Sequence, residues 1–156
     1  MFAARFASTL ALLLATTALA AQQAQSSAQG APAPAPIKAI KVILIGDSTT
    51  QVGSGWGGAF CSQHLTSFAA CVNLGRGGRS SGSYIVEGSW QIALNEMSTP
   101  GFVSTYVLIQ FGHNDQPGKP GRSTDLETEF PVNIARYVAE TRAKGATPIL
   151  VGRSVS

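Results

Sequence analysis

Residues 42–48 read Val-Ile-Leu-Ile-Gly-Asp-Ser, so that four apolar residues run directly into a glycine and two polar residues. An uninterrupted apolar run of this length is typical of a strand buried on both faces of a parallel sheet. We therefore predict a strand over residues 37–45. A glycine-rich turn over residues 46–55 should follow it and lead into a helix over residues 56–65.

Three further strands are predicted, over residues 70–73, 104–111 and 148–151. Helical or mixed structure is expected from the end of the 75–82 loop to Met97. The clearest helix begins near Pro131 and ends at Lys144, before Gly145, because proline suits the first helical position and glycine the position after the last turn. Strands that alternate with helices indicate an α/β fold with a doubly wound parallel sheet. The inward positions of the last helix should be Ile134, Ala135, Val138 and either Thr141 or Arg142.

The N-terminal part has the composition of an export signal followed by a linker. Residues 1–20 combine a short basic start, an apolar stretch and the small residues Ala18 and Ala20 of a cleavage site. The stretch is short for a membrane anchor, which is the alternative interpretation. Residues 21–36 are rich in Ala, Pro and Gln, which is typical of a disordered tether. We therefore expect a domain over residues 37–156 that is secreted or periplasmic, with no stable membrane anchor after cleavage.

Charge and cysteine content exclude several classes of protein. The net charge is +3 and the basic residues are scattered, so the sequence predicts no nucleic-acid partner. No Cys-x-x-Cys motif or Cys/His cluster indicates a metal, and no cofactor is expected. The two cysteines, Cys61 and Cys71, are candidates for a disulfide in an oxidising compartment; two buried free thiols are the alternative.

Three polar clusters follow the first three predicted strands, at residues 46–49, 75–81 and 112–115. Because sites in open α/β sheets form outside the carboxyl ends of the strands, the three clusters could meet in one crevice. Each cluster alone is ambiguous. Ser48 could be a turn or helix-capping residue, residues 75–78 a flexible loop, and Asn114 with Asp115 an Asx turn.

Taken together, the three clusters resemble the first three sequence blocks of the SGNH (GDSL) hydrolase family, over residues 42–151. The rhamnogalacturonan acetylesterase branch is the most similar. The resemblance implies a flavodoxin-like sheet of five strands, of which four are expected here. It also implies that Ser48 is the nucleophile. The oxyanion donors would be the backbone N–H groups of Ser48 and Gly78 and the side-chain amide of Asn114. The residues that suggest the branch are Asn73, Gly78-Arg79-Ser80, Ser83-Tyr84, Glu87-Gly88, Trp90 and Gln110-Phe111-Gly112-His113-Asn114-Asp115.

Other polar and aromatic residues have more than one interpretation. Arg79, Tyr84 and Trp90 are candidates for sugar contact, with packing and local hydrogen bonding as the alternative for each. Asp47 is expected to order the turn. His64 is expected to be solvated or to cap its helix. His113 is expected to be a pocket-wall or structural residue, since it should face away from its neighbour Asn114; a role as catalytic base is the alternative.

The resemblance predicts an exported serine esterase that removes acetyl groups from a pectin-like or rhamnogalacturonan-like polysaccharide through an acyl-serine intermediate. Its partner would be an acetylated carbohydrate or another small ester. The family takes its acid and base from an Asp-x-x-His motif near the C-terminus, and residues 1–156 contain no such motif. We therefore expect a C-terminally incomplete domain that is inactive alone. A lipase, phospholipase or thioesterase of the same superfamily, or a catalytically dead carbohydrate-binding remnant, are the alternatives.

Overall fold

The computed structural model describes residues 35–152 of the chain. The predicted signal peptide, residues 1–20, lies outside the described residues, as do residues 21–34 of the predicted linker. The compact unit of the described part begins at Ile37. No helix in this part of the chain is long and apolar enough to cross a membrane.

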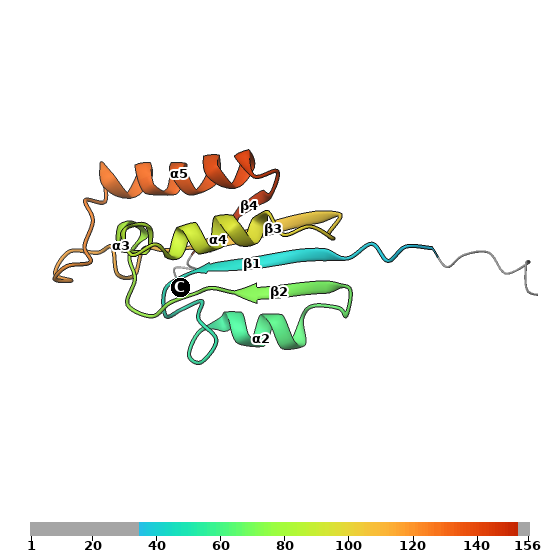
Figure 1. Cartoon of the computed structure of the whole chain (residues 1–156). Helices are drawn as coiled ribbons and strands as arrows, with labels where there is room; N and C mark the ends of the chain where they lie inside the picture. Colours follow the sequence, from blue (N-terminus) through green and yellow to red (C-terminus); the bar gives the residue numbers. More distant parts are fainter. Residues whose placement is uncertain (1–34, 153–156) are drawn as a thin grey trace, which may run out of the picture. The chain divides into compact units, whose positions relative to one another are not determined.

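A parallel sheet of four strands forms the centre of the domain (Figure 1). Its order is β2-β1-β3-β4, the order of a doubly wound, flavodoxin-like sheet, so the predicted fold class is confirmed. The apolar run of residues 42–45 forms the interior of β1, between two neighbouring strands, and is buried. The strands are β1 (Ile40–Gly46), β2 (Ala69–Asn73), β3 (Ser104–Gln110) and β4 (Thr147–Leu150).

Helices cover both faces of the sheet. Helix α2 (Trp56–Gln63) lies on one face, whereas α3 (Ser81–Val86), α4 (Ser89–Met97) and α5 (Glu129–Ala143) lie on the other (Figure 1). The segment expected to be mixed is two short helices, because Gly88 adopts a left-handed conformation, with φ of +89°, and separates α3 from α4. β1 begins at Ile40 rather than at residue 37.

Helix α5 differs from its prediction in where it begins and in which face it buries. It starts at Glu129, two residues before Pro131, and ends as expected before Gly145, whose φ is +74°. The predicted inward position Ala135 is exposed, whereas Tyr137 is fully buried. The reason is aromatic packing: the Tyr137 ring stacks on Phe111 at 5.1 Å and meets Trp90 edge-on at 4.7 Å.

The register of the strands aligns the three polar clusters at one edge of the sheet. Gly46 of β1 is paired with Gln110 of β3, and Leu44 of β1 is paired with Asn73 of β2. The three strands therefore end close together, at the same edge of the sheet. A backbone hydrogen bond of 2.9 Å from Arg76 to the carbonyl of Gly46 continues this pairing beyond the strands. The fold therefore brings together residues 46–49, 75–81 and 112–115, which lie far apart in the sequence.

The cysteines join helix α2 to strand β2. Cys61 and Cys71 are disulfide-bonded, with their Cα atoms 5.6 Å apart, a separation within the range that a disulfide requires. The bridge fixes α2 against the edge strand of the sheet. On the opposite edge, Ile149 and Leu150 of β4 are exposed.

Candidate active site

The turn after β1 is built around the carboxylate of Asp47. Its Oδ1 accepts hydrogen bonds of 2.8 Å from both the backbone N–H and the hydroxyl of Thr49. Its carbonyl accepts the N–H groups of Thr50 and Gln51. These bonds confirm that Asp47 orders the turn, and they hold Ser48 half-buried between two fixed neighbours.

A single amide oxygen on β3 anchors the same turn from the other side. Gln110 Oε1 accepts from the Thr50 hydroxyl at 2.9 Å and from the Trp56 indole N–H at 2.6 Å. The Thr49 hydroxyl lies 3.0 Å from the same oxygen and shares its one proton between Gln110 and Asp47. The turn approaches β3 so closely that a Cβ on Gly46 would lie 2.4 Å from the Gln110 carbonyl oxygen, which explains the glycine at this position. In the sequence, Gln110 stands out only through the family resemblance, and its anchoring role was not predicted.

The second cluster is attached to the first by its own polar groups. The Asn73 side-chain amide donates to the carbonyl of Thr50 at 2.9 Å, and its Oδ1 accepts the N–H of Gly75. Gly78 has a φ of +78°, in the left-handed region that favours glycine. The predicted oxyanion glycine therefore lies in a loop that is tied back to the nucleophile turn.

The third cluster reaches the second through two buried side chains. Asn114 donates from Nδ2 to the carbonyl of Arg79 at 3.1 Å. Asp115 accepts from the hydroxyls of Ser81 at 2.6 Å and Thr124 at 2.9 Å, and from the N–H of Ser81 at 3.0 Å. Asp115 thus joins the start of α3 to the loop after β3, a role that the short-range Asx-turn interpretation did not include.

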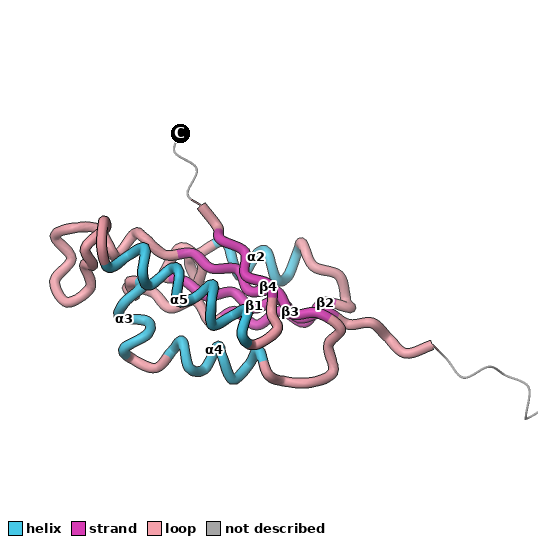
Figure 2. The backbone as a smooth tube through the Cα atoms, turned by 90° about the horizontal axis from the view of Figure 1, so that it is seen from above, coloured by secondary structure: helices cyan, strands magenta, loops and turns pink. Residues whose placement is uncertain are grey.

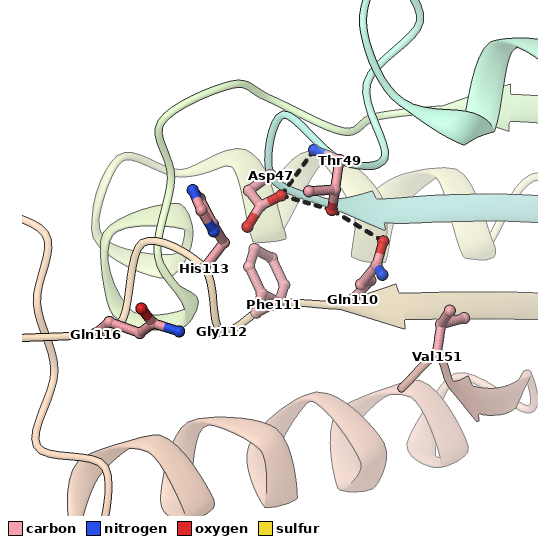
Figure 3. A pocket seen from close by; sticks show the side chains of 8 residues that line it. All are labelled: Asp47, Thr49, Gln110, Phe111, Gly112, His113, Gln116 and Val151. Carbon is pink, nitrogen blue, oxygen red and sulfur yellow. Dashed lines mark hydrogen bonds between the residues drawn. The ribbon is translucent and has the colours of Figure 1, made fainter. Parts of the chain in front are cut away.

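A cavity of about 410 Å³ opens between the β1 turn and the loop after β3. Figure 3 shows the side chains of Asp47, Thr49 and His113 on its wall. His113 is exposed whereas Asn114 is buried, so the two adjacent side chains have different environments, and His113 is a wall residue as predicted. Among the described residues, no histidine is hydrogen-bonded to Ser48. The other lining residues are Gln110, Phe111, Gly112, Gln116 and Val151.

The three candidates for sugar contact separate in the structure. Arg79 lines a second cleft, beside Gly78. Tyr84 and Trp90 are 0% and 2% exposed, so neither ring offers a surface to a polysaccharide, and the sugar-contact hypothesis is corrected for both. The Tyr84 hydroxyl donates to the Leu74 carbonyl, and the Trp90 N–H donates to Glu140. Burial, together with the negative charge of Glu87, raises the pKa of Tyr84 well above its usual range.

In the described part of the chain, no three His, Cys, Asp or Glu side chains lie close enough together to hold a metal ion. His64 is exposed and follows α2 as its capping residue, as expected. Glu87 pairs with Arg79 at 2.9 Å and accepts from Ser89. Partial burial opposes ionisation, but the hydrogen bonds from Ser89 and Arg79 lower the pKa of Glu87.

The chain has relatives among known proteins. No protein-family model matches the chain. Over 107 residues it is 36% identical to "Probable rhamnogalacturonan acetylesterase YesY" of Bacillus subtilis, covering 68% of this chain and 46% of that protein. Over 121 residues it is 38% identical to rhamnogalacturonan acetylesterase RhgT of the same organism, covering 73% of this chain and 49% of that protein. The chain belongs to the SGNH hydrolase family.

A solved structure shares the fold of this SGNH hydrolase. The crystal structure of YXIM from Bacillus subtilis matches with a TM-score of 0.57 at 23% identity, covering 74% of this chain and 33% of that one. The chain spans about half the length of the two curated relatives that it matches. Ser48, Gly78 and Asn114 follow β1, β2 and β3 respectively, and their catalytic roles remain predictions.

Proposed function

We propose that the protein is an exported serine esterase that removes acetyl groups from a polysaccharide of the pectin or rhamnogalacturonan type. The names of the two relatives support the substrate class. The observation that carries the proposal is the hydrogen bond from Asn114 Nδ2 to the Arg79 carbonyl. This bond holds a side-chain amide against the residue that follows Gly78, at the sheet edge where Ser48 also lies.

The proposed chemistry is acyl transfer through Ser48. The Ser48 hydroxyl loses its proton and Oγ bonds to the acetyl carbonyl carbon; the sugar alkoxide then leaves and takes up a proton. Water cleaves the acetyl-serine to acetate and restores the hydroxyl. The oxyanion would be held by the N–H groups of Ser48 and Gly78 and by Asn114, whose amide has a second N–H beyond the one bonded to Arg79. One such donor contributes on the order of 3 kcal/mol to the transition state.

We also propose that residues 1–156 by themselves turn over esters slowly. The sequence has two histidines, and neither is hydrogen-bonded to Ser48 within the described residues. Loss of the base in a serine triad lowers turnover by about 10⁶-fold. Turnover near that of a full-length relative, lost in His113→Ala, would instead identify His113 as the base.

Export is the part of the proposal that rests on residues 1–36. The basic start, apolar stretch and small residues predict cleavage after Ala20. Expression in a bacterial host followed by fractionation and N-terminal sequencing tests this. A mature chain in the periplasm or medium is expected, and an uncleaved chain in the cytoplasm would contradict it.

The test of the function compares acetate release from acetylated rhamnogalacturonan oligosaccharides with hydrolysis of long-chain p-nitrophenyl esters. We expect slow acetate release, followed over long incubations, that Ser48→Ala abolishes and Ser62→Ala does not. Ser62 is an exposed serine of α2 that bonds only its own helix. A preference for long acyl chains would favour a lipase or thioesterase. Equal release by folded Ser48→Ala would contradict the assignment of the nucleophile.

A further inference from the structure

A second cleft, of about 540 Å³, is lined by Gly77 and Gly78 and carries an excess of positive charge. Arg79, Ser83 and Glu87 line it from the α3 side, and Arg122 lines it from the loop after β3. Figure 2 shows α3 and the loops that follow β3 at the same end of the domain. The bonds of Asp115 to Ser81 and Thr124 fix the two walls relative to each other.

The two arginines of the cleft differ in what they bind. The Arg79 guanidinium is occupied: its Nε donates to Glu87 at 2.9 Å, and its Nη1 donates to the Gly77 carbonyl at 2.8 Å. Glu87 is also within 3.5 Å of Arg76 and accepts from Ser89, so its carboxylate is already shared. Arg122 is exposed and takes part in no ion pair within residues 35–152. The guanidinium of Arg122 is therefore available to a ligand.

The position of Arg122 relates this free charge to the proposed chemistry. Its Nη1 lies 3.3 Å from the point that a Cβ on Gly78 would occupy. Since the Gly78 N–H is a proposed oxyanion donor, an anionic group bound to Arg122 would lie next to the ester under attack. A guanidinium presents paired N–H donors in one plane, which match the two oxygens of a carboxylate.

We propose that this cleft is a subsite for a uronic acid unit of the polysaccharide, with Arg122 binding the sugar carboxylate. Arg79, held by Glu87, forms the opposite wall and adds to the positive potential. The proposal rests on the proposed function, because it makes Arg122 select acidic polysaccharides among acetylated ones. Arg122 is a specificity-determining residue and takes no part in the acyl transfer.

Binding of unacetylated trigalacturonate, measured by isothermal titration calorimetry with the full chain, tests the subsite without requiring catalysis. We expect trigalacturonate to bind more tightly than the neutral galactotriose. Arg122→Gln should weaken trigalacturonate binding about tenfold, because the charge-assisted hydrogen bonds between the guanidinium and the carboxylate are lost. Arg122→Lys, which keeps the charge but loses the paired donors, should give an intermediate loss. Arg142→Gln removes an equal charge from the exposed face of α5 and should change nothing.

Three results would overturn the proposal: no preference for trigalacturonate over galactotriose, unchanged binding in Arg122→Gln, or an equal loss in Arg142→Gln. Circular dichroism of each variant checks that it is folded, and Arg122→Lys still tests the subsite if Arg122→Gln unfolds. Ser48→Ala should bind trigalacturonate like the original chain. Failure of the subsite is therefore distinguishable from failure of the esterase assignment, which the acetate-release assay measures.

Discussion

Gly78 is the residue at which backbone conformation and proposed chemistry coincide. Its φ of +78° places any side chain in a strained conformation, at a cost of about 1–2 kcal/mol. Gly118 provides a matched control, with a φ of +79° and no atom within 4 Å of the point that a Cβ would occupy. We expect Gly78→Ala and Gly118→Ala to lower the free energy of unfolding similarly in urea.

The two alanine variants should differ in chemistry. Displacing one oxyanion donor slows acyl transfer roughly a hundredfold, so Gly78→Ala should slow acetylation of Ser48 by p-nitrophenyl acetate while Gly118→Ala does not. Equal rates in the two variants, with both folded, would argue that the Gly78 N–H does not contact the oxyanion.

Glu87 makes the wall of the second cleft sensitive to acid. Its pKa is lower in the folded chain than its ordinary value of 4.5, which is the value expected after unfolding. The stability that its ionised form contributes is therefore present above pH 4.5 and is lost as the pH falls through the lower, folded pKa. Glu87→Gln should flatten the loss of stability as the pH falls below 4.5, measured by urea unfolding. Glu127→Gln, which removes an exposed carboxylate before α5, is the control.

At the scale of elements, a buried ion pair joins strand β1 to helix α4. Lys41 is 1% exposed, and its Nζ lies 2.7 Å from Glu96 Oε1, 2.9 Å from the Glu96 carbonyl oxygen and 4.5 Å from the centre of the Phe102 ring. Removing the carboxylate leaves a buried ammonium group without its counter-charge, whereas removing the ammonium group leaves a carboxylate that is one-third exposed.

Glu96→Ala should therefore destabilise the fold by about 3 kcal/mol, and Lys41→Met by clearly less. Urea unfolding of both, with Gln91→Ala on the exposed side of α4 as the control, measures the difference. A loss in Lys41→Met as large as that in Glu96→Ala would contradict this account.

Strands and helices could be predicted from the sequence wherever a short-range pattern of residues determines the structure. The apolar run of residues 42–45 predicts a buried strand because each of its residues meets an apolar layer. Lys41 and Tyr137 were beyond such reasoning. A partner 55 positions away neutralises the first, and the second packs against Trp90 of α4 and against Phe111, which directly follows β3. Asp115 is similar: its partner Ser81 lies 34 positions away. Only the packed structure shows these contacts.

At the scale of the whole molecule, the disulfide holds the edge of the sheet to the helix that begins at Trp56. The loop that it closes spans 10 positions, for which the chain-entropy model gives about 3 kcal/mol. Exchange of both Cys61 and Cys71 for serine should lower the free energy of unfolding by about that amount, and reduction of the original chain should match it. Two free thiols in unfolded, non-reduced protein would contradict the bridge.

We propose that the three polar clusters meet around Ser48 and make it a nucleophile. The most direct test is to measure which serine becomes acetylated. Peptide mapping by mass spectrometry after incubation with p-nitrophenyl acetate at mildly alkaline pH compares every serine in one sample. We expect Ser48 to be acetylated faster than the exposed Ser62, and Asn114→Ala to slow the reaction at Ser48 alone. Acetylation of Ser48 no faster than that of Ser62, or unaffected by Asn114→Ala in a folded chain, would contradict the convergence.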